Sequence, residues 1–372
     1  MRDDVQLLVD GVIYGGWKKA GVTRAIDAAS GTFSLSVTDR WSPDSQPVKI
    51  NPGSSCEIRV AGEVVITGYV DLVRPSFSAA DHTIEVQGRD RSADMVDCSA
   101  VHKPDEWKNL TVLQLAEKLA KPFGVSVKAE VDVGAAIDLV KLQQGETALE
   151  ALNRHAKMRK LLVMPDGKGG ILLTRAGVRR AAVELVQGQN ILDASGTLDW
   201  SERYSDYIVK GQAGFKETTD GETESHVTGS AKDPAITRYR PLLVVSDTET
   251  TAATAAERAK WEANTRLGKA AQATITVQGW RQTAGGALWE PNMLVAVKSA
   301  WLGIDGEMLI RQVTFDKSSG GTTTQLEIIS PQAYAPEPIG TKKSKKGGAF
   351  NEAIGEDVRD WMKKIEGGNS GK

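Results

Sequence analysis

Four histidines and a few carboxylate pairs are the residues whose types could support catalysis or metal binding. Zinc sites and histidine-based catalytic sites need their ligands at short, regular spacings, as in H-E-x-x-H. No such spacing occurs in this chain, where the histidines stand far apart: they are His82, His102, His155 and His226. We therefore expect surface or helix histidines, with no bound metal and no cofactor.

A peptidoglycan hydrolase would need two carboxylates on either side of a sugar cleft. The candidate pairs are Glu146 with Glu150 and Asp132 with Asp138. Glu150 follows Thr147 at the spacing of a capping box, in which its side chain caps a helix, and the aspartates are expected in turns. The sequence also lacks a G-x-S-x-G elbow and a Walker A loop. It therefore predicts no catalytic residue and a protein that is not an enzyme.

Aromatic and sulfur-containing residues give no stronger chemical signal. A sugar-binding platform would need several tryptophans on one face, but the nine are scattered: Trp17, Trp41, Trp107, Trp200, Trp261, Trp280, Trp289, Trp301 and Trp361. Such scatter is typical of core residues and interface anchors. The two cysteines, Cys56 and Cys98, form no C-x-x-C motif and are expected to be buried thiols.

The composition indicates a globular protein made in a cytoplasm. A chain of 372 residues should form roughly two to four domains. The net charge of −2 gives no reason to expect nucleic acid or an anionic membrane as the main partner. No run of the sequence approaches the roughly 18 apolar residues of a membrane span. Residues 1–4 are mostly charged and do not resemble the start of a secretory signal.

Residues 1–97 are predicted to form a first β-barrel domain. Apolar and polar residues alternate at period two in short runs such as 33–37 and 83–86, a pattern typical of half-buried strands. Asp10-Gly11 separates two further apolar runs and favours a tight hairpin turn. Several short strands joined by turns indicate a small barrel or sandwich.

Residues 98–178 are predicted to form an α+β module. Two capping boxes, which begin at Thr111 and Thr147, predict the starts of two helices. Between residues 161 and 173, two apolar runs then flank the Gly-rich sequence 167–170. Because no helix follows that could hold a phosphate, we interpret this sequence as the turn of a β-hairpin.

Residues 179–335 are predicted to form a second β-barrel domain with an insertion around residues 211–268. Residues 211–232 are polar and rich in Thr, Glu and Gly, so we expect an exposed, mobile loop. Residues 248–267 contain many alanines and precede Gly268. This pattern indicates one helix with a glycine at its C-terminal end.

The segment 336–372 is predicted to be a linker followed by a helix. Four apolar side chains of this helix are spaced four, three and four residues apart, as in a heptad seam; they are Ile354, Val358, Trp361 and Ile365. A lone helix of this length is marginal in water, so we expect it to form an interface with another protein or to pack on its own chain. The lysine-rich run 342–346 is either a solvated linker or a contact with DNA or an acidic partner.

A weak internal repeat relates the two β regions. Residues 62–70 align with residues 306–314, so that Glu63 matches Glu307. Three strand patterns recur around these segments in the same order and at nearly the same spacing, although any two antiparallel meanders could match by chance. If the repeat is real, the chain carries two similar barrels, and three chains around an axis would present six.

Six segments carry a resemblance to a known family: residues 5–11, 16–17, 22–26, 31–36, 88–100 and 201–207. In their order and spacing they resemble the Mu-like baseplate hub family of contractile phage tails, over nearly all the chain up to about residue 334. The resemblance implies a mainly β protein with an α+β insert, which assembles as a ring-shaped homotrimer. It also implies assembly in the host cytoplasm and a final place in the virion.

Three functional interpretations follow. The first is a structural hub that adapts a sixfold tail tube to a threefold central spike; its partners are its own copies, the spike, and the tube or adjoining baseplate proteins. DNA would pass through its lumen without specific binding, and no membrane would be involved. The second is an envelope-acting enzyme, such as a peptidoglycan hydrolase, or a sugar-binding tail component. The third is the equivalent hub of a tailocin or a secretion-type injection device.

Overall fold

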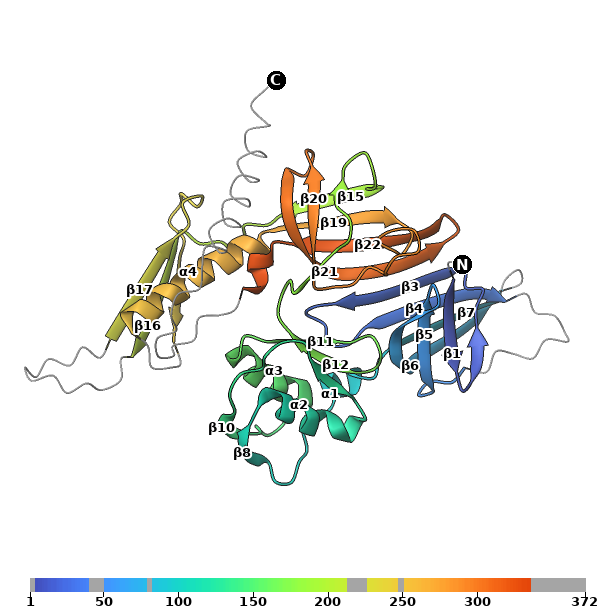
Figure 1. Cartoon of the computed structure of the whole chain (residues 1–372), viewed down its shortest axis with the longest axis horizontal. Helices are drawn as coiled ribbons and strands as arrows, with labels where there is room; N and C mark the ends of the chain where they lie inside the picture. The colour runs from blue at the N-terminus through green and yellow to red at the C-terminus, as the bar shows by residue number, and fades with distance from the viewer. Residues whose placement is uncertain (1–3, 40–49, 79–81, 213–225, 247–250, 336–372) are drawn as a thin grey trace, which may run out of the picture. The chain divides into compact units, whose positions relative to one another are not determined.

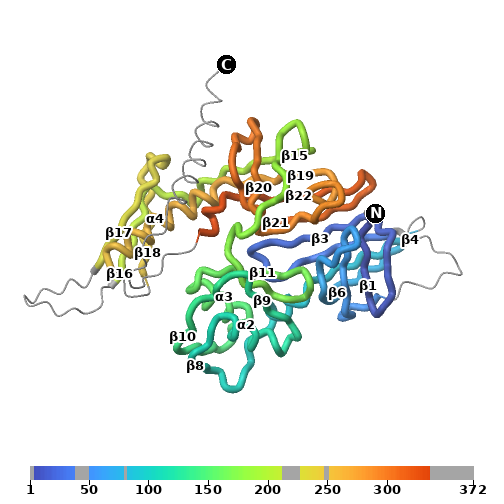
Figure 2. Tube along the Cα trace, in the orientation of Figure 1, coloured from blue at the N-terminus to red at the C-terminus, as the bar shows by residue number. Residues whose placement is uncertain are grey.

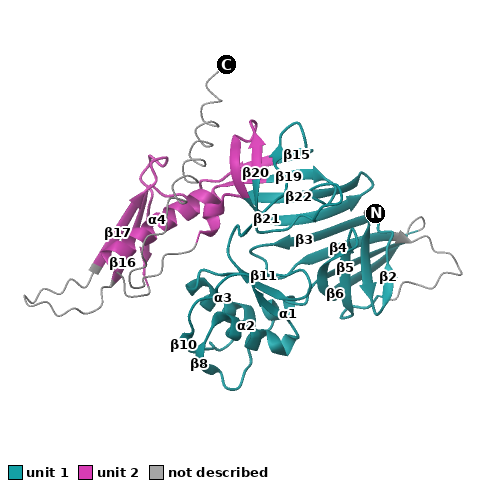
Figure 3. Ribbon diagram, in the orientation of Figure 1, with its two compact units in different colours: residues 1–194, 274–295, 309–328 teal, residues 195–273, 296–308, 329–372 magenta. Residues whose placement is uncertain are grey.

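The computed structural model describes residues 4–39, 50–78, 82–212, 226–246 and 251–335 (Figure 1). The chain divides into two compact units (Figure 3). Unit 1 contains Met1–Ala194, Thr274–Val295 and Leu309–Ile328, and unit 2 contains Ser195–Ala273, Ala296–Met308 and Ile329–Lys372. None of the described helices has the length and apolar character needed to span a membrane.

A 14-stranded sheet contains most of the strands. Its members are β1 (Val5–Val9), β2 (Val12–Tyr14), β3 (Lys19–Ala25), β4 (Thr32–Asp39), β5 (Ser55–Val60), β6 (Glu63–Phe77), β7 (His82–Asp90), β13 (Arg179–Arg180), β14 (Leu185–Val186), β15 (Asp193–Leu198), β19 (Ala271–Gln278), β20 (Met293–Ser299), β21 (Ile304–Ser318) and β22 (Gly321–Ile329). The hydrogen-bonded order is β15-β19-β22-β21-β3-β4-β7-β6-β5-β1-β2, and β20 pairs with β21, β13 and β14.

Local sequence signals explain several of these strands. Asp10 and Gly11 join β1 to β2 with φ values of 50° and 81°. This left-handed backbone suits Asp-Gly and allows the tight hairpin. Along β1 and β5, side chains alternate between buried and partly exposed, as the period of two requires.

The internal repeat expected from the sequence is present as two three-stranded meanders. In the first, β5, β6 and β7 have 6, 15 and 9 residues. In the second, β20, β21 and β22 have 7, 15 and 9 residues. Glu63 begins β6 and Glu307 lies near the start of β21, so the aligned glutamates occupy similar places in both meanders.

The two meanders do not form two separate closed barrels in the described residues. Instead, β3 of the N-terminal region pairs with β21 of the C-terminal region, with Val22 opposite Phe315 (Figure 2). The strand path therefore runs continuously through both meanders, and among the described strands it does not close on itself. The sequence could not predict this pairing, because it joins residues that are nearly 300 positions apart.

Residues 93–174 contain the α+β module, which has its own apolar core. Its elements are α1 (Ala93–Asp97), β8 (Glu106–Leu110), α2 (Val112–Ala120), η1 (Lys121–Phe123), β9 (Val127–Ala129), β10 (Ile137–Lys141), α3 (Ala148–Met158), β11 (Leu162–Pro165) and β12 (Ile171–Thr174). Both capping boxes are formed, at Thr111 and at Thr147. β11 and β12 form the predicted hairpin around residues 167–170.

Unit 2 contains a three-stranded sheet of order β17-β16-β18 that packs against one helix. The elements are β16 (Asp206–Gln212), β17 (His226–Lys232), β18 (Pro241–Val245), α4 (Ala252–Lys269) and η2 (Pro331–Tyr334). Gly229 allows the helix to lie close to the sheet, since a Cβ at this position would stand 2.1 Å from the carbonyl carbon of Ala255.

Three sequence predictions need correction. Residues 211–232 are not one loop, because their ends belong to β16 and β17 and only 213–225 lie outside the described residues. The helix begins at Ala252, and Gly268 lies inside it, where a Cβ would come within 2.6 Å of the Ala333 nitrogen of η2. That glycine therefore serves helix packing and does not end the helix. Cys56 is buried as expected, but Cys98 is exposed.

Candidate functional site

The chemically reactive side chains do not converge in the part of the chain that the structure describes. No group of three or more His, Cys, Asp or Glu residues there could hold a metal ion. His155 is buried on α3, where burial lowers its pKa. His82 and His226 begin the strands β7 and β17, and His102 lies before β8. The isolated positions of the histidines thus agree with their scatter in the sequence.

Three of the four carboxylates that were considered for sugar hydrolysis have contacts within their own part of the chain. Glu150 accepts a hydrogen bond from the Thr147 N–H at 2.8 Å and so completes the capping box. Glu146 pairs with the Arg154 guanidinium at 2.8 Å. Asp132 accepts a hydrogen bond from the N–H of Gly134 at 3.0 Å, as expected for a turn. Asp138, the fourth of these carboxylates, lies exposed on β10.

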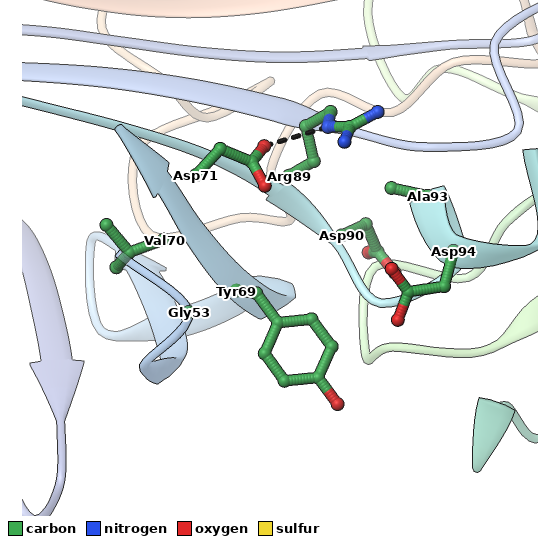
Figure 4. Close-up of a pocket in the computed structure, with 8 residues that line it drawn as sticks. All are labelled: Gly53, Tyr69, Val70, Asp71, Arg89, Asp90, Ala93 and Asp94. Atoms are coloured by element: carbon green, nitrogen blue, oxygen red, sulfur yellow. Dashed lines mark hydrogen bonds and ion pairs between the residues drawn. The ribbon is translucent and has the colours of Figure 1, made fainter. Parts of the chain in front are cut away.

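A polar hollow of about 340 Å³ lies where β6 and β7 meet α1 (Figure 4). It is lined by Gly53, Tyr69, Val70, Asp71, Arg89, Asp90, Ala93 and Asp94. Arg89 donates to Asp71 and to Asp97, each at 2.8 Å, so its charge is compensated within the chain. Asp90 is 1% exposed, and burial raises its pKa to about 6. The buried Asp90 carboxyl thus lies where the large sheet, through β7, is followed by α1 of the α+β module.

Arg24 is the buried cation of the same junction. It lies on β3, and its Nη2 donates to the Pro165 carbonyl oxygen at 3.3 Å. Burial lowers the pKa of its guanidinium. Gly167 makes room for this group, since a Cβ there would stand 2.8 Å from the Arg24 Cζ. Arg24 therefore holds the β11–β12 turn against the sheet, a role that the sequence by itself did not predict.

In unit 2, the segment 201–207 forms a second buried network. Arg203 makes two hydrogen bonds of 2.9 Å to the Asp233 carboxylate, and its guanidinium lies 4.3 Å from the centroid of the Trp200 ring. The Tyr204 N–H donates to the Tyr207 hydroxyl at 3.1 Å. Residues 201–207, which carry part of the family resemblance, therefore stabilise the start of β16 through contacts within unit 2.

Unpaired strand edges and exposed apolar side chains remain as candidate interaction surfaces. Among the described strands, none pairs with the outer edge of β15 or with the edge of β6 that faces away from β7 along residues 71–77. Among the described residues, the large apolar side chains that are more than half exposed are Val12, Ile13, Phe77, Val101, Met158, Leu192, Tyr239, Leu243, Val245 and Trp301. Phe77 ends β6 and Leu192 directly precedes β15, so each of the two free edges has one exposed apolar side chain beside it, and open strand edges are sites where another chain can pair.

The predicted interface of the C-terminal helix lies outside the described residues. Ile354, Val358, Trp361 and Ile365 all belong to the segment 336–372. The described chain ends at Ala335, whose carbonyl oxygen accepts a hydrogen bond from the Trp261 indole on α4 at 2.7 Å. The role of the four residues therefore stays a prediction.

Taken together, these features define a class of protein. The described residues contain a continuous sheet built from two related meanders, buried charge networks with structural roles, and free strand edges, but no assembled metal site. The fold class is therefore that of a mainly β protein with an α+β module.

Comparison with known proteins identifies the family. Three family models match: the Mu phage baseplate assembly protein GpP-like N-terminal domain at residues 4–90, the baseplate hub protein gp44-like second domain at 92–175, and the GpP fourth domain at 251–337. The chain is 33% identical to the baseplate hub protein gp44 of Escherichia phage Mu, over 98% of this chain and 97% of that protein. The chain belongs to the Mu-like baseplate hub family, whose place is the phage tail.

Solved structures agree with this assignment. The 43 kDa tail protein of prophage MuSo2 from Shewanella oneidensis has a TM-score of 0.79 and 36% identity, over 90% of this chain and 100% of that one. A tail protein from Neisseria meningitidis MC58 has a TM-score of 0.74 and 25% identity, over 90% and 98% of the two chains. The protein is thus a structural baseplate hub of a Mu-like phage tail.

Proposed function

We propose that this hub protein acts as a homotrimer that joins a sixfold tail tube to a threefold central spike. The observation that supports this proposal is the pair of meanders, β5-β6-β7 and β20-β21-β22, with nearly equal strand lengths. Three chains with two similar meanders each would present six similar β units around one axis. Such a ring can match a sixfold partner on one side while it keeps threefold symmetry for the other.

The proposed partners follow from this geometry. The sixfold side would contact the tail tube or adjoining baseplate proteins, and the threefold side would contact the central spike. DNA would pass through the lumen without specific binding, which agrees with a net charge of −2. Assembly in the host cytoplasm would precede incorporation into the virion, and the hub would have no catalytic activity of its own.

The C-terminal segment is the proposed contact with the spike or with a neighbouring subunit. Its four apolar residues, Ile354, Val358, Trp361 and Ile365, have the spacing of one helical seam. Deletion of residues 349–372 should weaken spike binding, as measured by co-purification of the two proteins. A full-length chain with all four residues changed to Ser keeps the length of the segment, so it separates loss of the seam from loss of the linker. Unchanged spike binding by both variants would contradict the docking role.

The trimer itself is tested by mass and by shape. Light scattering on the purified chain should give three times the mass of one chain, and electron micrographs of the same sample should show particles with a central hole. A muramidase assay on the same sample should show no activity. A monomer without a hole, or clear release of peptidoglycan fragments, would contradict the proposed function.

A further inference from the structure

The two meanders of the chain have equivalent neighbours in the large sheet, with one difference. The first meander lies in the order β3-β4-β7-β6-β5, and the second in the order β15-β19-β22-β21, with β20 also paired to β21. By position, β15 is therefore equivalent to β3, β19 to β4, β22 to β7, and β21 to β6. The difference concerns the outer strands, because among the described strands β3 is paired on both edges and β15 on only one.

Within the chain, β3 uses its second edge to bind the second half of β21. The pairing is antiparallel and runs from Ala25 opposite Gln312 to Ala20 opposite Lys317. Counted from the ends of these two 15-residue strands, the equivalent part of β6 is residues 71–77, which has no partner on this edge among the described strands. Five of these seven side chains are exposed. Within the described residues, one strand pairing thus connects the two meanders, and the corresponding edges of β15 and β6 are both open.

We propose that the free edge of β15 pairs with residues 71–77 of β6 in a second copy of this chain. The β3–β21 joint within one chain is the template for this contact, so the new joint is antiparallel. By the same template, Asp193 lies near Ser76 of the other copy, and Leu198 lies near Asp71. This inference rests on the proposed trimer and names the surface by which its copies meet.

Apolar side chains at one end of the two edges favour the pairing, while Pro75 of β6 has no N–H to donate to the new ladder. Leu192, which is 57% exposed, adjoins the start of β15, and Phe77, which is 84% exposed, ends β6. The antiparallel direction brings these two apolar side chains to the same end of the joint. Burial of apolar groups next to a new strand ladder would stabilise the contact.

The head-to-tail nature of this contact also limits the assembly. Each copy offers one β15 edge and one β6 edge, so that every interface is heterologous and repeats around an axis. A closed ring fills both of these edges in every copy, which removes the aggregation risk that they carry when open. A ring of three copies meets the proposed hub symmetry.

Cysteine cross-linking tests the pairing in the full chain. The background carries Cys98→Ser, because Cys98 is exposed and Cys56 is buried. The test variant adds Ser76→Cys and Asp193→Cys, and a short bis-maleimide reagent tolerates a shift of one residue in register. The matched control replaces Ser76→Cys by Val12→Cys, which places the thiol on the half-exposed β2 at the opposite end of the sheet path.

We expect covalent dimers and trimers from the test variant and only background cross-linking from the control, on denaturing gels. Light scattering on the same samples distinguishes the strand pairing between copies from the formation of the trimer. A trimer that cross-links no better than the control would overturn the strand pairing and leave the hub trimer intact. A monomer at every concentration would overturn both.

Discussion

Arg203 and Asp233 form a buried, two-pronged ion pair in unit 2. Arg203 Nε lies 2.9 Å from Asp233 Oδ2, and Nη2 lies 2.9 Å from Oδ1. The two residues are 1% and 8% exposed. Because desolvation offsets most of the attraction between buried charges, such a pair adds little net stability, but a lone partner is strongly destabilising. The pair therefore fixes the segment that precedes β16 next to the segment that follows β17, because any arrangement that separates them would leave a buried charge unpaired.

We expect Arg203→Ala to lower the free energy of unfolding by about 3–5 kcal/mol, since it leaves the Asp233 carboxylate buried without a cationic partner. The double variant Arg203→Ala with Asp233→Ala should lose less than the sum of the two single losses. Urea denaturation followed by tryptophan fluorescence measures these values. As a control, Lys232→Ala removes an exposed contact of 3.8 Å to Asp206 and should cost no more than about 1 kcal/mol. Equal losses from both sites would contradict this role of burial.

Because Gly167 lies against Arg24, we expect Gly167→Ala to lower the free energy of unfolding more than Gly53→Ala does. Gly167 and Gly53 both have a left-handed backbone, with φ of 77° and 84°. Replacement by alanine should therefore strain both positions, by about 1–2 kcal/mol. Only at Gly167 would the new Cβ also meet the Arg24 guanidinium, at 2.8 Å, whereas nothing lies within 4 Å at Gly53. Gly167→Ala should consequently destabilise the chain by about 1–3 kcal/mol more than Gly53→Ala in chemical denaturation; equal costs would refute the contact.

The raised pKa of Asp90 leads us to expect that the chain becomes more stable on mild acidification. Its pKa is about 6 in the folded chain, against 3.8 for an ordinary aspartate. The folded state thus binds the proton more tightly than the unfolded state, and the free energy of unfolding rises as the pH falls from about 6 to about 4. The gain should be about 3 kcal/mol relative to Asp90→Asn, which cannot titrate. Urea denaturation at a series of pH values measures the difference between the two proteins.

Asp97 supplies the control of opposite sign for this pH series. The hydrogen bond from Arg89 lowers the pKa of its carboxyl. Its contribution is present above the ordinary value of 3.8 and is lost as the pH falls further. At neutral pH, Asp97→Asn should therefore have a lower free energy of unfolding than the unchanged chain. At a pH well below 3.8 the two proteins should be equally stable. A slope of the same sign for both variants would contradict the assignment of Asp90.

Thr147 tests a capping box that was already visible in the sequence. Its hydroxyl accepts a hydrogen bond from the Glu150 N–H at 3.2 Å, and Glu150 accepts one from the Thr147 N–H. Thr147→Ala should cost about 1 kcal/mol of stability, because it leaves a helix N–H without a partner. Thr147→Ser keeps the hydroxyl and should cost much less. Loss of the thermal midpoint to the same extent in both variants would show that packing of the methyl group, and not capping, is important.

Local signals were the most reliable part of the sequence analysis. The hairpin at Asp10-Gly11 and the capping boxes at Thr111 and Thr147 are confirmed. Each depends on residues within four positions of one another, so no tertiary information is needed to recognise it. The sequence predicts a helix over residues 248–267, whereas the structure has it over 252–269. The end was predicted too early because Gly268 resembles a C-terminal glycine, although its role is to allow the close approach of η2.

The recurrence of three strands around Glu63 and Glu307 was a pattern that the sequence by itself determined, since strand length and alternation are written in consecutive residues. Only the tertiary structure decided that β3 binds β21 and that the strands form one continuous sheet. It also decided that Arg24 is buried against Pro165. Backbone hydrogen bonding between strands is the same for any sequence, so strand choice depends on the packing of residues far apart in the chain, which a local pattern does not encode.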